Sequence, residues 1–136
     1  MLVRDVMTSD PVTVQATDPI SAALDALFEA DIRHLPVVRG EALVGMISDR
    51  DVRDLGFPID WENDGAEAAL QQLANPIASV MNSEPIRVDE ETEIADVIDL
   101  IITHRIGAIP VVDPDTLHPV GIVSYVDILR AVRDNV

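Results

Sequence analysis

The chain of 136 residues contains no cysteine. This absence excludes disulfide bonds, thiolate zinc sites and a cysteine nucleophile, and it agrees with a reducing cytoplasm. Only one Trp, one Tyr and two Phe are present, so aliphatic side chains must fill the core. No apolar run approaches the roughly 18 residues that a membrane-spanning helix needs. We therefore expect a cytoplasmic protein with no membrane contact.

Lysine is also absent, and all nine basic residues are arginines. They face 25 acidic residues, which gives a formal net charge of −16. A surface this acidic repels phosphate backbones, so the composition argues against a general role in nucleic-acid binding. Apolar residues make up 48% of the chain, which is enough to build a core. The simplest interpretation is a folded protein with a solvated acidic surface.

Motifs of catalysis are missing as well. The sequence contains no GxSxG elbow, no HExxH pair, no P-loop and no long glycine-rich loop. Asp49 and Asp51 could bind Mg²⁺, but two carboxylates near a helix start are ordinary helix chemistry. The protein is therefore not expected to be an enzyme, and no catalytic residue, metal site or cofactor is predicted.

What the chain does contain is an internal repeat. Three segments recur in the same order, the first two after a shift of 74 residues and the third after 76: VMTSDPVTV (6–14) and VMNSEPIRV (80–88), ISAALDALFEADIRHLPVV (20–38) and IADVIDLIITHRIGAIPVV (94–112), VGMIS (44–48) and VGIVS (120–124). The two extra residues fall in a polar turn, where insertions are tolerated. The repeat predicts one structural unit built twice.

Each half predicts the order strand, helix, strand, strand, helix. The first helix of each half carries an apolar stripe at i, i+3, i+4, i+7 and i+8. The stripes are Ile20, Ala23, Leu24, Leu27 and Phe28, and Ile94, Val97, Ile98, Ile101 and Ile102. Asp18 and Thr92 mark the helix starts. Met7 and Met81, at equivalent positions, are interpreted as core filling.

These patterns predict an α+β fold of two β-α-β-β-α repeats. The repeats span 1–55 and 77–136, and a connector at 56–76 contains a short helix around AEAALQQLA. Each half is too small to be stable by itself. The two repeats, which have matching apolar faces, should therefore pack against each other about a pseudo-two-fold axis.

Both halves end in the pattern G-h-h-S-x-x-D, as GMISDRD at 45–51 and GIVSYVD at 121–127. At a helix start, Ser-x-x-Asp predicts a capping interaction. The same geometry can bind a ligand, because helix N–H groups and a Ser hydroxyl attract phosphate and an ionised Asp can accept both hydroxyls of a ribose. The Gly would let a ligand or a neighbouring backbone come close. The two interpretations are compatible.

The duplicated pattern, the hxxPVV strand and the G-h-h-S-x-x-D ending together resemble a tandem pair of CBS domains, the module named after cystathionine β-synthase. The resemblance covers the chain apart from the connector at 56–76. It implies two clefts between the repeats that bind adenosine-containing ligands such as AMP, ADP, ATP or S-adenosylmethionine. It also implies a stand-alone regulatory module that acts as a homodimer or through an unknown regulated protein. A ligand-free scaffold for dimerisation or docking remains an alternative.

The resemblance assigns residues to both clefts. The first cleft comprises Ser48 and Asp51 for phosphate and ribose, Arg33, His34 and Arg50 for positive charge, and Thr92, Val97, Ile106 and Gly107 as the opposing wall. The second comprises Ser124 and Asp127 for the ligand, Gly107, Ala108 and Ile122 beside them, and Asp18, Ala23 and Ile32 from the first repeat. In the second cleft Ala108 replaces His34, and Tyr125 and Val126 replace Asp49 and Arg50. A polyphosphate should therefore prefer the first cleft.

Overall fold

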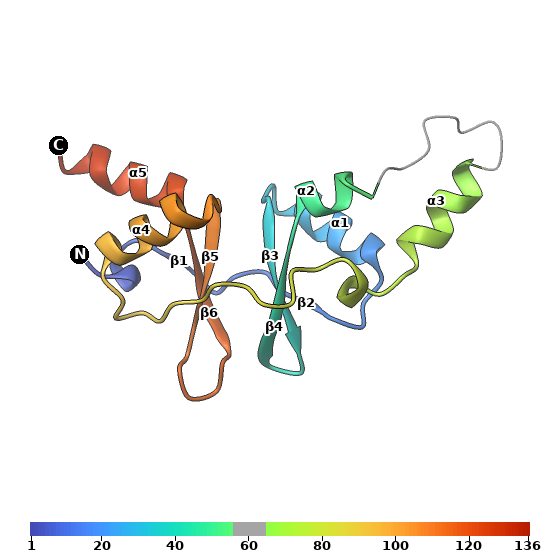
Figure 1. The fold of residues 1–136 in the computed structure, drawn as a ribbon, viewed down its shortest axis with the longest axis horizontal. Coiled ribbons are helices and arrows are strands. Elements are labelled where there is room, and N and C mark those ends of the chain that lie inside the picture. The colour runs from blue at the N-terminus through green and yellow to red at the C-terminus, as the bar shows by residue number, and fades with distance from the viewer. Residues whose placement is uncertain (56–64) are drawn as a thin grey trace. The chain divides into compact units, whose positions relative to one another are not determined.

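The computed structural model describes residues 1–55 and 65–136 (Figure 1). The elements in chain order are η1 (Val3–Asp5), β1 (Thr8–Ser9), β2 (Val14–Gln15), α1 (Ile20–Glu29), β3 (His34–Arg39), β4 (Ala42–Ser48), α2 (Asp49–Arg53), α3 (Gly65–Leu73), η2 (Ile77–Ser79), α4 (Ile94–His104), β5 (Ala108–Val112), β6 (Pro119–Ser124) and α5 (Tyr125–Asp134). The predicted α+β class and the order of elements are confirmed. The helix expected in the connector is α3, and residues 56–64 of the connector lie outside the described residues.

The first strand differs between the repeats. In the first repeat, β2 pairs in parallel with β3, with Val14 opposite Val37. In the second repeat, Val88 makes only an isolated parallel bridge to Val111. The elements η1, α1, β3, β4 and α2 correspond to η2, α4, β5, β6 and α5, and β1 corresponds to the isolated bridge between Met46 and Asn82. The repeated sequence thus encodes a repeated structure.

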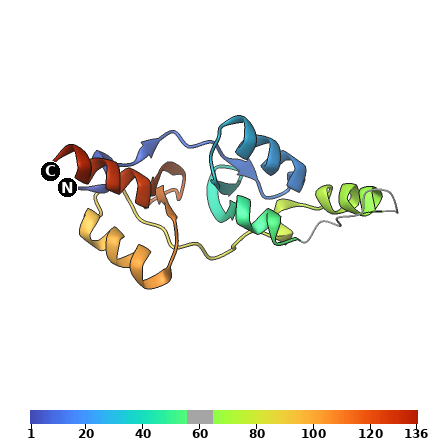
Figure 2. The same ribbon diagram turned by 90° about the horizontal axis from the view of Figure 1, so that it is seen from above.

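The chain forms two compact units, each with its own three-stranded sheet and core. The Ser48 unit comprises residues 12–40 and 44–84 and contains the sheet β2-β3-β4. The Ser124 unit comprises residues 1–11, 41–43 and 85–136 and contains the sheet β1-β6-β5. The first eleven residues thus belong to the unit of the second repeat, and Figures 1 and 2 show this blue segment beside α4 and α5. The predicted domains follow the repeats along the sequence. In the structure, the start of each repeat belongs to the unit of the other repeat: residues 1–11 lie in the Ser124 unit and residues 77–84 in the Ser48 unit. We call these two stretches the exchanged segments.

Backbone hydrogen bonds hold the exchanged segments at equivalent positions of the two units. In the Ser124 unit these bonds are Val3 N–H to Thr92 O (2.8 Å), Arg4 N–H to Glu90 O (3.0 Å) and Ile94 N–H to Met1 O (3.0 Å). In the Ser48 unit they are Ile77 N–H to Asp18 O (2.8 Å), Ala78 N–H to Ala16 O (3.0 Å) and Ile20 N–H to Asn75 O (2.9 Å). Because each bond has a counterpart 74 residues away, the exchange is a property of the repeat.

The glycine of each G-h-h-S-x-x-D motif makes room for the exchanged segment. A Cβ at Gly45 would lie 2.5 Å from Met81 Sδ and 2.8 Å from Asn82 O. A Cβ at Gly121 would lie 2.5 Å from Met7 Sδ and 3.0 Å from Thr8 O. Of the two expectations for these glycines, close approach of a neighbouring backbone is therefore what the structure shows. Met7 and Met81 pack against the cores, as predicted.

The apolar stripes of α1 and α4 are narrower than predicted. Ile20, Ala23 and Leu27 are buried, and so are Ile94 and Val97. Phe28, by contrast, is 88% exposed, and its repeat equivalent Ile102 is 68% exposed. These two positions of the apolar stripe therefore lie at the surface and not in the core.

The residues expected to cap α1 and α4 bind elsewhere. Asp18 Oδ2 accepts a hydrogen bond from Gln15 N–H (2.9 Å), and Thr92 Oγ1 accepts one from Asp89 N–H (3.3 Å). The N-cap positions are Pro19 and Glu93, and neither side chain makes a capping bond. The predicted helix starts were right to within two residues, but both side chains stabilise the preceding turn instead.

The charges of the described residues are mostly unpaired and lie at the surface. The ion pairs found in residues 1–55 and 65–136 all involve exposed arginines. No polar or charged residue of this part of the chain is buried. Among the helices that the structure describes, none has the length and apolar character required to cross a membrane.

Replacing Gly45 by alanine should destabilise the Ser48 unit. The added methyl group would overlap Met81 Sδ and the Asn82 carbonyl, and overpacking of this kind costs about 1–3 kcal/mol. Gly121→Ala should cost less, because the nearest backbone atom is 3.0 Å away rather than 2.8 Å. Urea unfolding of the two variants measures the difference. Wild-type stability of Gly45→Ala would contradict the close approach.

Candidate functional site

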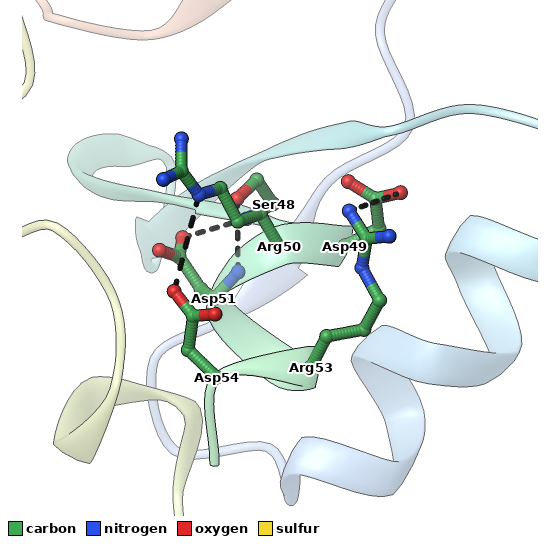
Figure 3. A network of polar contacts seen from close by, with 6 residues as sticks. All are labelled: Ser48, Asp49, Arg50, Asp51, Arg53 and Asp54. Atoms are coloured by element: carbon green, nitrogen blue, oxygen red, sulfur yellow. Dashed lines mark hydrogen bonds and ion pairs between the residues drawn. The ribbon is translucent and has the colours of Figure 1, made fainter. Parts of the chain in front are cut away.

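The first G-h-h-S-x-x-D motif places its polar residues where β4 ends and α2 begins. Ser48 Oγ accepts a hydrogen bond from Asp51 N–H (3.1 Å), and Asp51 Oδ2 accepts one from Ser48 N–H (2.9 Å). Figure 3 shows this reciprocal pair at the start of the helix. The capping interpretation of the motif is confirmed.

The second motif folds in the same way at the junction of β6 and α5. Ser124 Oγ accepts from Asp127 N–H (3.1 Å), and Asp127 Oδ2 accepts from Ser124 N–H (2.9 Å). All four side chains are half-buried, so part of each remains accessible to solvent. The equal distances show that the two motifs provide the same local geometry.

A backbone hydrogen bond joins each motif to the start of the neighbouring strand. Asp49 N–H donates to Arg33 O (3.0 Å), and Tyr125 N–H donates to Gly107 O (3.1 Å). The first bond brings Arg33, and His34 after it, beside the Ser48 motif. The second brings Gly107 and Ala108 beside the Ser124 motif, and Ala108 is paired with Ser124 in the sheet. Each end of the repeat is thus built from two segments that sequence reasoning had grouped correctly.

Arginines and carboxylates both lie around the Ser48 motif. Arg33 is exposed, and the side chain of Arg50 is 82% exposed. Arg50 Nε lies 4.0 Å from Asp54 Oδ2, and Arg53 Nη2 lies 3.7 Å from Asp49 Oδ2 (Figure 3). Exposed pairs of this kind contribute little to stability, so they do not lock the arginines in place.

Arg53 and Asp54 were not among the predicted site residues. Their i, i+4 spacing from Asp49 and Arg50 is the signal that could have identified them.

His34 is half-buried at the first position of β3. Its pKa is lowered from the ordinary histidine value, first because burial disfavours the charged ring. Asp49 and Asp51 act in the opposite direction by favouring the imidazolium, whereas Arg33 lowers the pKa further. The ring is therefore mainly neutral at pH 7.

The Ser124 motif lacks these charges. The residues that correspond to His34, Asp49 and Arg50 are Ala108, Tyr125 and Val126. Ala108 is buried, and the other two side chains are exposed. The same backbone geometry thus presents apolar side chains at this end, and arginines, a histidine and carboxylates at the other.

The remaining predicted residues occupy several environments. Val97 and Ala23 are fully buried in the cores of their units, so their side chains offer no surface here. Ile32, Ile106, Gly107 and Ile122 are half-buried, and so are Asp18 and Thr92. Each predicted cleft draws residues from both units. The joining of those residues in one cleft stays a prediction.

Sequence reasoning did not identify a hollow of about 370 Å³ in the Ser124 unit. It is lined by Arg4, Asp89, Glu90, Glu91, Val112, Asp113 and Pro114. Carboxylates dominate this lining, so it is unsuited to a phosphate, and none of the predicted site residues takes part. Among the described residues, no three His, Asp or Glu side chains are grouped so that they could hold a metal ion.

Comparison with known proteins assigns the fold. The family model of the CBS domain matches residues 3–56 and 77–134. The chain belongs to the CBS domain family. The CBS-pair resemblance drawn from the repeated motif is confirmed.

Relatives of this CBS pair differ in length. YlbB of Bacillus subtilis is 28% identical over 135 residues, which cover 98% of this chain and 83% of YlbB. The inosine-5'-monophosphate dehydrogenase of Methanocaldococcus jannaschii is 28% identical over 127 residues, which cover 93% of this chain but only 22% of the enzyme. The chain therefore spans most of one relative and about a fifth of the other.

Solved CBS pairs resemble the chain along its whole length. The CBS pair of protein MJ0100, in complex with 5'-methylthioadenosine and S-adenosyl-L-methionine, has a TM-score of 0.81 at 28% identity, with 100% of this chain and 98% of that chain covered. CBSX2 of Arabidopsis thaliana has been solved in complex with AMP. That complex has a TM-score of 0.81 at 26% identity, with 98% and 97% covered.

Removing either cap should destabilise the fold. Ser48→Ala and Ser124→Ala each lose a hydrogen bond to the first helical turn, which typically costs about 0.5–2 kcal/mol. Ser83→Ala, at an exposed serine outside both motifs, serves as the control and should leave stability unchanged. Thermal unfolding followed by circular dichroism measures all three. Wild-type stability of Ser48→Ala would show that the cap is not used in solution.

Proposed function

We propose that this CBS pair binds an adenosine-containing nucleotide of the AMP, ADP or ATP class and regulates another protein in response. The observation that carries the proposal is the group formed by Arg33, Arg50 and the titratable His34 beside the Ser48 motif. In a chain of net charge −16, such a group is where an anionic ligand should bind. The AMP complex of the similar CBSX2 agrees with this ligand class.

The capped helix start leaves hydrogen-bonding capacity for a ligand. Asp51 uses Oδ2 to accept the Ser48 N–H, and a carboxylate has further acceptor positions for the hydroxyls of a ribose. Ser48 Oγ accepts the Asp51 N–H, so its own hydrogen can be donated to a phosphate oxygen. Arg33 and Arg50 are exposed and can reach the same phosphate. Thr92, Ile106 and Gly107 of the Ser124 unit are proposed as the opposing wall, whereas the side chain of Val97 is buried in the core.

The Ser124 motif is proposed as a second, weaker nucleotide site. Asp127 is placed to accept a ribose, but Ala108, Tyr125 and Val126 supply no charge for a phosphate. Its proposed lining is Gly107, Ala108 and Ile122, with Asp18 and Ile32 from the Ser48 unit, whereas the side chain of Ala23 is buried in the core. S-adenosylmethionine, which the CBS pair of MJ0100 binds together with methylthioadenosine, is the alternative ligand.

The proposed activity is regulation rather than catalysis. The chain aligns with about a fifth of an inosine-5'-monophosphate dehydrogenase, so CBS pairs occur as parts of larger enzymes. Neither motif places a nucleophile beside a base, and both serines are engaged as helix caps. We infer that nucleotide binding alters the surface presented to a regulated protein.

A second copy of the chain is proposed to cover an exposed apolar face of the Ser124 unit. Side chains of α4 and α5 form it: Ile102 (68% exposed), Tyr125 (52%), Leu129 (60%) and Val132 (46%). The two helices contact each other, so these side chains belong to one unit surface. Apolar surface of this kind is typical of association sites.

The second candidate function is a scaffold that binds no ligand. It is favoured by one observation, which is that Ser48 and Asp51 already satisfy each other as a helix cap. A scaffold does not, however, account for the two arginines and the titratable histidine beside that cap.

Calorimetric titration with AMP distinguishes the two functions. Asp51→Ala removes the ribose acceptor and Arg33→Ala removes a phosphate contact. Charged hydrogen bonds of about 1.5–3 kcal/mol imply an affinity loss of roughly ten- to a hundredfold for each. Arg33→Ala should spare uncharged adenosine, because only the phosphate contact is lost. Asp127→Ala, the matched control, removes the equivalent cap but should barely change AMP binding. Equal AMP affinities of wild type and Asp51→Ala would establish the scaffold instead.

The proposed dimer is tested by changing its face. Leu129→Glu places a charge in the apolar patch and should shift sedimentation toward a monomer, because burying an unpaired charge is costly. Leu70→Glu, on α3 and also 68% exposed, is the control and should leave the sedimentation coefficient unchanged. A wild-type monomer at high micromolar concentration would rule the dimer out.

A further inference from the structure

His34 differs from the other cations of the Ser48 motif because it can lose its charge near neutral pH. It begins β3 and is half-buried, while Arg33 and Arg50 are exposed. The hydrogen bond from Asp49 N–H to Arg33 O (3.0 Å) fixes the start of β3 beside the first turn of α2. The ring is therefore held next to the site where the phosphate is proposed to bind.

The charged groups that act on His34 come from its own strand and from α2. Arg33, on the same segment, opposes protonation of the ring, whereas Asp49 and Asp51 of α2 favour it. Asp49 is itself paired with Arg53 at 3.7 Å, and Asp51 is engaged by the Ser48 N–H. The two carboxylates are thus partly compensated, and burial decides that the free protein carries a neutral ring.

We propose that phosphate binding at the Ser48 motif is coupled to protonation of His34, so that nucleotide affinity increases as the pH falls through neutrality. This inference rests on the proposed nucleotide function. It adds a regulatory input, because the same nucleotide concentration would then occupy the site to a different degree at different pH.

The sign of the coupling follows from the charges. In the free protein, burial holds the pKa of His34 below the ordinary histidine value. A phosphate dianion beside the ring favours the imidazolium and raises that pKa in the complex. A group whose pKa rises on binding takes up a proton, so binding strengthens as the pH falls between the complex value and the free value. The affinity then changes by at most about tenfold per pH unit for one such group.

The second repeat provides an internal comparison. Ala108 occupies the position equivalent to His34, so the Ser124 motif has no group that titrates there. The nucleotide phosphate itself has a pKa near about 6 and contributes its own proton exchange. Because the two titrations interact, the difference between wild type and a His34 variant contains the His34 proton together with the response of the phosphate to it, and following the His34 ring directly separates the two.

The test is calorimetric titration of the full chain with AMP between about pH 6 and pH 8, in buffers of different ionisation enthalpy. Wild type should take up a fraction of a proton more than His34→Gln, which keeps a polar side chain but cannot titrate. The AMP affinity of wild type should rise severalfold more than that of His34→Gln as the pH is lowered. His118→Gln is the matched control, because His118 is exposed and lies outside the motif. It should behave as wild type.

Nuclear magnetic resonance keeps the test decisive if His34→Gln binds no AMP. The chain has only three histidines, so the ring signals can be assigned by substitution. The midpoint of the His34 titration should move to higher pH when AMP is added. Identical proton uptake by wild type and His34→Gln, or an unmoved His34 midpoint with AMP bound, overturns the coupling alone. No AMP binding by wild type at any pH overturns the nucleotide function together with it.

Discussion

The close approach of an exchanged segment to a glycine is the contact on which the candidate site depends. Gly45 and Gly121 each lie three residues before the serine that caps the following helix. If the strand moved away to accommodate a side chain, the serine would move with it. The steric requirement at the glycine and the hydrogen bonds at the serine are therefore parts of one constraint. This explains why the motif joins a residue without a side chain to two polar residues.

The sequence predicted best what local spacing determines. Elements of the two repeats follow from the apolar periodicity, and the caps at Ser48 and Ser124 follow from the Ser-x-x-Asp spacing, because both depend on residues within one or two turns. Phe28 and Ile102 were placed wrongly, since periodicity says which face a residue occupies but not whether anything covers that face.

Hydrogen-bond partners and long-range contacts do not follow from the periodicity of apolar residues. The side chains of Asp18 and Thr92 can accept a hydrogen bond either from the following helix or from the preceding turn. The local sequence does not show which of the two bonds forms. The exchange of segments joins residues as distant as Met1 and Ile94, which lies beyond any local pattern. Arg33, His34 and Arg50 were assigned to one site from the family resemblance, and the bond from Asp49 to Arg33 shows that their two segments adjoin.

Two identical backbones with different charges show how a repeat can diverge without altering its fold. At the Ser48 end, side chains at three positions supply or tune charge, and at the Ser124 end the same positions are apolar. The hydrogen bonds of the cap are the same at both ends. Tyr125 and Val126 are exposed and Ala108 is buried, so the chemistry of each end changes while the capped turn is kept.

The exchange of segments has a consequence for how the chain can be divided. A cut in the connector, between residues 55 and 65, would leave each half with a segment that belongs to the other unit and without the methionine that packs on its own glycine. Such halves would be incomplete separately, yet each would carry what the other needs. Two separately produced repeats should consequently reconstitute both units when they are mixed, as complementary fragments of one protein.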